Sequence, residues 1–176
     1  MDFYTIYPSE YVDRDFSFDL KGKQEIVVDY FKFDLSDNFL KNPRINLDYD
    51  NIFSDQLDEI LETDFYYSSS GILLFSKRFF NKMKEILENE CDFYRCYVRN
   101  EEAYIYAMYI KRKNNLLDED DFIKKDLAID DFIKKDLAID DFFIARDTDK
   151  PYIYVVSQKF VDTINKFKLK MNFLEY

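Results

Sequence analysis

Two segments of the chain repeat one pattern, in which a short apolar run leads into a serine and then into an amphipathic stretch. They read ILLFSKRFFNKMKEI (Ile72–Ile86) and IYVVSQKFVDTINKF (Ile153–Phe167). After each serine the apolar residues recur three and four positions apart, which is the period of one helix face. The apolar run before each serine is typical of a buried strand. The sequence therefore predicts two strand–serine–helix units, and these need a sheet on which their helices can pack.

The remaining pattern completes the expected fold. Strands are predicted at Asp2–Tyr7, Gln24–Phe33, Gly71–Phe75, Cys91–Val98, Ala103–Ile110, Tyr152–Val156 and Met171–Leu174. The fourth and fifth form a hairpin that turns near Asn100-Glu101, and the fifth is apolar on both faces, as a central strand is. A helix is expected within Ile52–Leu61, with Ser54 or Asp55 able to cap it. We expect an α+β fold, a mostly antiparallel sheet with a few packed helices, as a single domain over residues 1–176.

A serine at a strand-to-helix turn has two interpretations, as a nucleophile or as a helix cap. A nucleophile elbow needs small residues on both sides of the serine, and Ser76 and Ser157 both have bulky neighbours. The chain also contains no histidine that could serve as the base. We therefore expect each hydroxyl to accept a hydrogen bond from a free amide in the first turn of its helix.

The scarce residue types exclude several kinds of site. The chain has two glycines, too few for a Gly-rich phosphate loop, and too few Cys and His residues for an ordinary zinc site. Cys91 and Cys96 are five residues apart in one predicted strand, so we expect them on opposite faces as reduced core thiols. We expect no cofactor and no metal ion. No signal peptide and no long apolar run is present, so we expect a cytoplasmic protein that does not bind membranes.

The formal net charge is −11. A surface of this sign repels nucleic acids and anionic lipids, and it attracts basic proteins and speeds their association. Solubility is the alternative explanation of the same charge.

The densest acidic cluster, Asp118 to Asp121, opens a duplicated decapeptide at residues 120–139. The acids lack the alternating spacing, the central glycine and the closing glutamate of an EF-hand, so a solvated acidic turn is expected. Residues Asp120–Ile129 and Asp130–Ile139 are identical. Ten residues leave successive copies about 80° out of phase on a helix, so one regular helix cannot bury both apolar sets on one face. We interpret the second copy as a duplication within a loop-rich region.

The order of these segments resembles an immunity-protein family of bacterial polymorphic toxin systems, formerly a domain-of-unknown-function family. The likeness covers about Gly71 to Tyr176 and rests on Phe142-Phe143-Ile144-Ala145-Arg146, on Tyr152–Ser157 and on Phe173. The chain departs from the family at Lys168-Leu169-Lys170, where members have a Gly-containing turn, and in its second decapeptide. The resemblance implies a protein that binds and silences a partner toxin, and it carries over no catalytic residue.

We therefore expect an immunity protein that neutralises a cognate toxin by occlusion, through an acidic, aromatic-rich surface and without chemistry of its own. The residues predicted to contact the partner are Tyr109, Asp118, Glu119, Asp120, Asp121, Asp130, Asp131, Asp140 and Asp141. Two alternatives stay open, a carboxylate-based enzyme and a generic protein-binding adaptor. An enzyme should have a concave pocket with convergent acids of perturbed pKa, whereas an inhibitor should present a convex or shallow acidic face.

Overall fold

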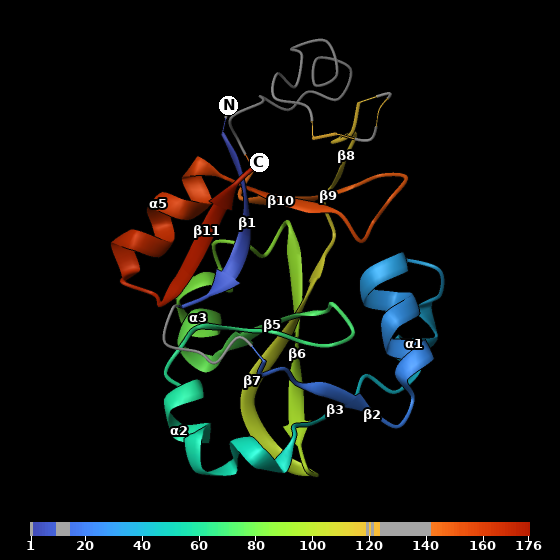
Figure 1. The fold of residues 1–176 in the computed structure, drawn as a ribbon. Coiled ribbons are helices and arrows are strands. Elements are labelled where there is room, and N and C mark those ends of the chain that lie inside the picture. The colour runs from blue at the N-terminus through green and yellow to red at the C-terminus, as the bar shows by residue number, and fades with distance from the viewer. Residues whose placement is uncertain (1, 10–14, 119, 121, 124–141) are drawn as a thin grey trace.

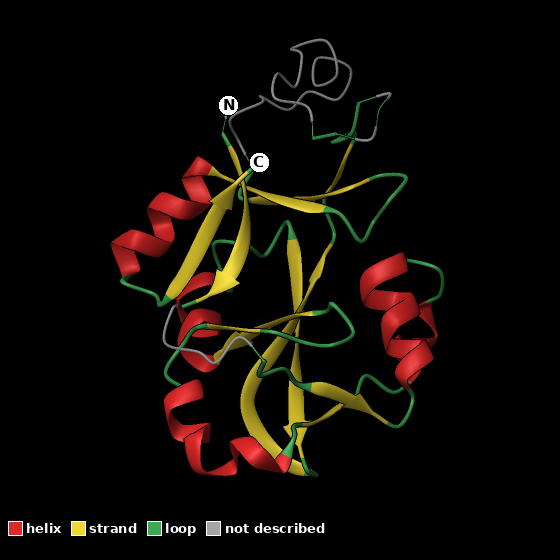
Figure 2. Cartoon of the chain, in the orientation of Figure 1, coloured by secondary structure: helices red, strands yellow, loops and turns green. Residues whose placement is uncertain are grey.

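Two β-sheets form the framework of the fold (Figures 1 and 2). The computed structural model describes residues 2–9, 15–118, 120, 122–123 and 142–176. One sheet, the terminal sheet, has the strand order β11-β1-β10-β9-β8 and contains both ends of the chain. Its strands are β1 (Phe3–Pro8), β8 (Lys113–Asn114), β9 (Ile144–Asp147), β10 (Tyr154–Ser157) and β11 (Met171–Glu175).

The other sheet, the central sheet, has the strand order β2-β3-β6-β7-β5-β4. Its strands are β2 (Asp19–Lys21), β3 (Ile45–Asp48), β4 (Phe65–Tyr66), β5 (Leu73–Ser76), β6 (Cys91–Val98) and β7 (Glu101–Ile110). The predicted hairpin is β6–β7, and β7 lies inside the sheet between β6 and β5, as its apolar faces indicated. Antiparallel pairs dominate both sheets, while β3–β6 and β8–β9 are parallel.

Helices cover the sheets from several sides (Figure 1). They are α1 (Gln24–Val28), the π-helix η1 (Asp29–Phe33), the 3-10 helices η2 (Asp37–Lys41) and η3 (Asn51–Gln56), α2 (Leu57–Ile60), α3 (Lys77–Met83) and α5 (Gln158–Phe167). The chain is thus α+β with mostly antiparallel sheets, as predicted.

Both strand–serine–helix units are confirmed. Ser76 is the last residue of β5 and accepts from the Phe79 amide at 3.0 Å, and Ser157 is the last residue of β10 and accepts from the Phe160 amide at 3.4 Å. Phe79 and Phe160 are fully buried in the hydrophobic cluster between the two sheets, with ring centroids 6.2 Å apart. The two units therefore meet at the first turn of each helix.

The predicted strand at Gln24–Phe33 is wrong, because this segment forms α1 and η1. Its buried residues are Val27, Tyr30 and Phe31, and side chains three and four positions apart lie on one face of a helix. Their side chains pack on the central sheet in a second hydrophobic cluster, and the aromatic ring of Tyr30 stacks on Tyr109 at 4.3 Å. Burial of this stripe outweighs the strand preference of the individual residues.

Two helix boundaries also differ from the prediction. The helical segment at 51–60 begins earlier than expected, because Asp50 caps η3 by accepting from the Ile52 amide at 3.1 Å, instead of Ser54 or Asp55. Helix α3 ends at Met83, although the apolar stripe continues through the buried Leu87 in the turns that follow.

The two cysteines are free and buried on opposite faces of the central sheet, as their spacing predicted. Cys91 belongs to the cluster between the sheets and Cys96 to the cluster beneath α1. Burial raises the pKa of both thiols, that of Cys96 to about 12, which keeps them protonated.

Candidate functional site

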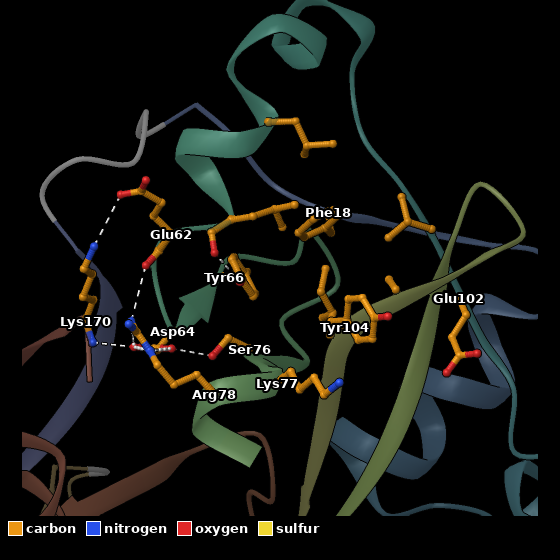
Figure 3. A pocket seen from close by; sticks show the side chains of 15 residues that line it. Phe18, Glu62, Asp64, Tyr66, Ser76, Lys77, Arg78, Glu102, Tyr104 and Lys170 are labelled. Atoms are coloured by element: carbon orange, nitrogen blue, oxygen red, sulfur yellow. Dashed lines mark hydrogen bonds and ion pairs between the residues drawn. The ribbon is translucent and has the colours of Figure 1, made fainter. Parts of the chain in front are cut away.

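A groove of about 710 Å³ opens beside the end of β5, between α2 and the first half of β7 (Figure 3). We call it the β7 notch. Its apolar lining is Phe18, Leu57, Leu61, Tyr66, Val98, Ala103 and Ile105. Its charged lining is Glu62, Asp64, Lys77, Arg78, Glu102 and Lys170. A cavity of this size with an apolar floor and few polar groups has the make-up of a binding site.

The notch exists because two neighbouring strands end at different places. Strand β5 pairs with β7 only as far as Ser76, opposite Ile105, and there the chain turns into α3. Strand β7 extends four residues further, over Glu101–Tyr104. On the side away from β6, this part of β7 has no strand partner among the described residues. The Tyr104 side chain consequently stands 66% exposed at the mouth of the notch.

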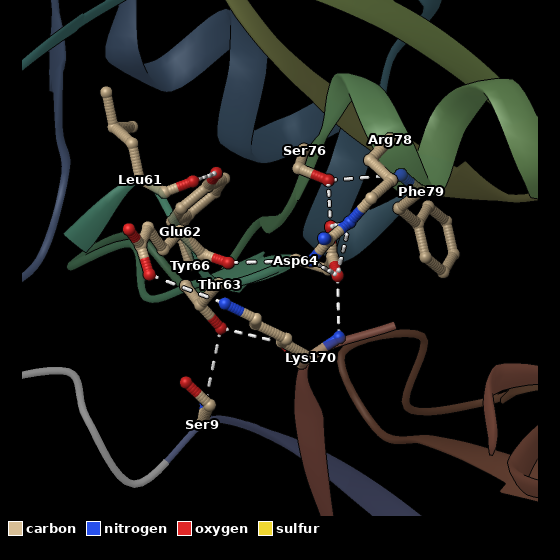
Figure 4. Close-up of polar contacts among 10 residues, drawn as sticks. All are labelled: Ser9, Leu61, Glu62, Thr63, Asp64, Tyr66, Ser76, Arg78, Phe79 and Lys170. Atoms are coloured by element: carbon tan, nitrogen blue, oxygen red, sulfur yellow. Dashed lines mark hydrogen bonds and ion pairs between the residues drawn. The ribbon is translucent and has the colours of Figure 1, made fainter. Parts of the chain in front are cut away.

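A buried carboxylate holds one end of the notch together (Figure 4). Asp64 is 1% exposed and accepts from the Ser76 hydroxyl, from the Arg78 guanidinium and from the Lys170 amide, the last at 2.6 Å. The bond from Arg78 to Asp64 raises the pKa of the guanidinium above its ordinary value. All three donors hydrogen-bond this buried carboxylate, as the burial of a polar group requires.

The same end of the notch is tied to the terminal sheet. The Asp64 amide donates to the Lys170 carbonyl at 2.8 Å, and the Thr63 hydroxyl donates to the same oxygen at 2.8 Å. The Ser9 amide in turn donates to the Thr63 hydroxyl at 3.3 Å. Segments far apart in the sequence thus fix the position of β4 and of the start of α3, and the notch is pre-formed.

The α2 wall, by which we mean residues 51–62 beside the notch, is strongly acidic, although only Leu57, Leu61 and Glu62 of it line the cavity. Residues 45–76 contain seven acids and no lysine or arginine. Asp55, Asp58 and Glu59 are exposed and have no basic partner within the part of the chain that the structure describes. Glu62, one helical turn after Asp58, forms an exposed ion pair with Lys170 at 3.4 Å. Negative potential therefore accumulates along α2 and the preceding η3.

The opposite wall is cationic and aromatic. The Lys77 ammonium lies over the Tyr104 ring, 4.3 Å from its centroid, where a cation–π interaction holds it. Figure 3 shows these two side chains at the end of the notch away from Asp64, with Glu102 beyond them. Glu102 is paired with Arg95 on β6. Lys77 is thus the cation at this end of the notch, whereas Arg78 and Lys170 pair with the acids at the other end.

Tyr109, a predicted contact residue, lies elsewhere and is half-buried. Its hydroxyl donates to Asp34 at 2.7 Å and accepts from Arg146 at 2.6 Å. Burial and the bond to Asp34 raise the pKa of Tyr109 to about 12. Burial also favours a higher pKa for Asp34, but the bonds from Lys113 and Tyr109 outweigh it and hold that pKa below its usual range. The Tyr109 hydroxyl joins β7, η1 and β9 inside the protein.

The predicted acidic cluster is only partly described. Asp118 and Asp120 are exposed, and the Asp118 carboxylate accepts from the amides of Asp120 and Phe122 at 3.0 and 2.9 Å. Phe122 is 71% exposed in the same turn. Glu119, Asp121, Asp130, Asp131, Asp140 and Asp141 lie outside the described residues, as does most of the duplicated decapeptide.

The structure does not bring Tyr109 and the Asp118 turn into the notch. The notch residues were missed because they come from five separate parts of the chain. One sequence signal could have found part of the site, the 32-residue stretch without a basic residue. Among the described residues, no group of three or more His, Cys, Asp or Glu side chains is placed to share a metal ion.

No helix in the described ranges is long and apolar enough to cross a membrane. No family model, no curated protein and no solved structure matches this chain.

Proposed function

We propose that this chain is an immunity-type protein that acts in the cytoplasm, where it binds a basic toxin domain and neutralises it by covering its working surface. The observation that carries the proposal is a pre-formed apolar notch beside the α2 wall, in which Asp55, Asp58 and Glu59 are exposed and have no basic partner among the described residues. A rigid site of this kind loses little entropy on binding, which favours tight association.

The charge pattern supports a basic protein as the partner. With a net charge of −11, the whole surface attracts cations from a distance, and the α2 wall concentrates that attraction at one place. The acidic turn at Asp118 and Asp120, with the exposed Phe122 two residues further on, adds a second acidic surface with an aromatic side chain. A nucleic-acid-cleaving toxin has a basic substrate site, which such a surface would cover.

Binding is favoured over carboxylate catalysis because each acid in the notch already has a cationic partner. Asp64 is paired with Arg78, Glu62 with Lys170 and Glu102 with Arg95. Ser76, which also lines the notch, is 7% exposed and uses its hydroxyl both to cap α3 and to bond Asp64. In the proposal, therefore, these groups shape the surface and perform no reaction.

The test uses the protein encoded next to this chain. Its C-terminal domain should be toxic when produced alone, and co-production of this chain should restore growth. Purified partners should associate with a rate constant that falls steeply as ionic strength rises from low to physiological values. A neighbouring protein that is harmless, or whose toxicity this chain leaves unchanged, would sink the proposal.

Two sets of charge-neutralising substitutions distinguish acids that only attract the toxin from a distance from acids that contact it in the complex. One set is Asp55→Asn, Asp58→Asn and Glu59→Gln in the α2 wall, and the other is Asp118→Asn, Glu119→Gln, Asp120→Asn and Asp121→Asn. Both sets should slow association at low salt, since both reduce the negative field. Only a set that touches the toxin should also speed dissociation. An association rate that neither set changes at low salt would exclude steering.

A further inference from the structure

We propose that the β7 notch receives an extended, positively charged segment of the partner protein, with an apolar side chain on the notch floor and a cationic side chain against the α2 wall. The inference rests on the proposed function, since it assigns the contact surface and the chemistry of the segment that the partner inserts. It assigns the notch a role that neither the acidic turn at Asp118 nor Tyr109 fulfils.

The shape of the notch favours an extended segment. The part of β7 that continues past the end of β5, Glu101–Tyr104, is about 13 Å long at the usual rise of a strand. A segment of about four residues placed beside it would continue the line of β5 across the central sheet, as peptides do when they add a strand to an open edge. The chain itself leaves this place because Ser76 turns it into α3.

The register of β7 changes at the same place. Arg95 pairs with Tyr106 and Tyr97 with Glu102, so three residues of β7 stand opposite one residue of β6. Bulges of this kind re-aim side chains and are frequent beside binding sites. Here the irregular stretch includes Tyr104, whose exposed ring resembles the aromatic anchors on which interfaces depend.

The chemistry of the walls fixes the orientation of the segment. On the α2 side, Leu57 and Leu61 present an apolar surface directly beside Glu62. On the α3 side, Lys77 repels a cation. A basic side chain of the partner is therefore favoured toward α2, and an apolar neighbour can reach the floor at Phe18 and Ile105.

The Asp64 network keeps this geometry ready for binding. Asp64 fixes the start of α3 through Ser76 and Arg78, and it fixes β11 through the Lys170 amide. The notch therefore requires no rearrangement of the main chain before a segment can enter, which preserves affinity.

Synthetic peptides test the notch without the toxin. The probe is a capped Arg-Phe-Arg-Val-Arg peptide, compared with Glu-Phe-Glu-Val-Glu and with an Arg-Phe-Arg-Val-Arg peptide whose alternate amides are N-methylated. We expect the basic peptide to bind at least ten-fold more tightly than the acidic one, and N-methylation to weaken it. Amide chemical shifts should change at Glu101–Tyr104, Leu57 and Leu61.

Substitutions in the chain sharpen the test. Leu61→Arg puts a bulky cation on the notch floor, and Leu40→Arg is its matched control on η2, since the two leucines are 39% and 47% exposed. We expect Leu61→Arg to weaken peptide and toxin binding at least ten-fold and Leu40→Arg to leave both unchanged. Tyr104 and Glu62 are exposed, so we expect Tyr104→Ser and Glu62→Lys to fold normally, and each should also weaken binding.

The outcomes separate this inference from the proposed function. If the toxin is neutralised equally well by Leu61→Arg, Tyr104→Ser and Glu62→Lys, the notch is not the contact surface, although the immunity function stands. If the peptide binds but no toxin is neutralised, the notch assignment stands and the proposed function fails. Equal binding of the basic and acidic peptides would overturn the assigned chemistry.

Discussion

The two strand–serine–helix units share their local structure and differ in what the serine hydroxyl donates to. In both, the serine caps a helix by accepting from the amide of a buried phenylalanine three residues later. The Ser76 hydroxyl then donates to the buried carboxylate of Asp64, whereas the Ser157 hydroxyl donates to the main-chain carbonyl of Phe142 at 2.6 Å. The first unit is fixed by a charge beside the notch, and the second is fixed by the main chain inside the protein. The shared local motif therefore does not determine which tertiary contact each serine hydroxyl makes.

The second unit also depends on a carboxylate, which acts through the main chain next to Phe142 and does not touch Ser157. Glu90 accepts from the amides of Phe143 and Ile144 at 2.9 Å each, and it pairs with Arg112 at 3.1 Å. These amides follow Phe142, so Glu90 positions the carbonyl that Ser157 bonds. Each unit thus has its own buried acid, Asp64 in direct contact and Glu90 through the β9 segment.

The largest effect is expected at Glu90. Glu90→Ala removes the carboxylate that accepts from Arg112 and from two amides, and the Arg112 side chain is only 13% exposed. We expect a loss of about 3–5 kcal/mol in the free energy of unfolding, measured by urea denaturation. Glu90→Gln is the matched control and should lose less, because its carbonyl still accepts. A loss below about 1 kcal/mol for Glu90→Ala would mean that β9 holds Phe142 without the carboxylate.

A smaller loss is expected at Asp64. Asp64→Ala removes the acceptor for Ser76, Arg78 and the Lys170 amide, but the Arg78 side chain is 47% exposed and can turn into water. We expect about 2–3 kcal/mol, with amide exchange accelerated in α3 and not in α5. Glu62→Gln, an exposed neighbour, is the control and should change stability by less than about 0.5 kcal/mol. Equal acceleration in both helices would contradict the assignment of a separate buried acid to each unit.

Local patterns predicted much of this fold, and the limits of the prediction are physical. The apolar spacing after Ser76 and Ser157 is set within one helix, so both units and their caps could be predicted. The segment at Gln24–Phe33 was mistaken for a strand because the contacts that select its helix, such as Tyr30 on Tyr109, lie far away in the sequence. The apolar stripe after Ser76 continues to Leu87, so it could not predict that helix α3 ends at Met83.

The notch was beyond sequence patterns for a similar reason. It arises where β5 stops and β7 continues. This depends on the register between two strands that α3 and β6 separate in the chain. Asp64 looks like an ordinary surface acid in the sequence, and only Lys170, from the last part of the chain, completes its surroundings. Tyr109 was predicted to contact the partner; its hydroxyl bonds Asp34 and Arg146 inside the protein, and these bonds could not be seen in the sequence.

The two serines give the most direct test of the comparison. Each Ser→Ala change removes a cap and one donated bond. Ser157→Ala should cost about 1 kcal/mol, since its donated bond goes to a neutral carbonyl, and Ser76→Ala about 2 kcal/mol, because the bond to the Asp64 carboxylate is the stronger one. Aspartate can cap a helix as well as serine does, so Ser157→Asp should recover part of the loss. Ser76→Asp should not, since it places a second carboxylate beside Asp64. Equal costs and equal recovery at both sites would show that the capping bond alone matters.

The smallest effect is expected from shortening the segment between the two units. Deleting Asp130–Ile139 joins Ile129 to Asp140, a junction identical to the natural one at Ile139–Asp140, so the local sequence is preserved on both sides. The change in loop-closure entropy is well under about 1 kcal/mol for ten residues. We therefore expect a folded variant in which the Phe79 and Phe160 amides keep their protection from exchange and the toxin is still neutralised. A variant that folds and protects poorly would assign the second copy to the contact surface. A variant that does not fold would mean that both copies belong to the core, and the interpretation of the repeat as a duplication within a loop would be wrong.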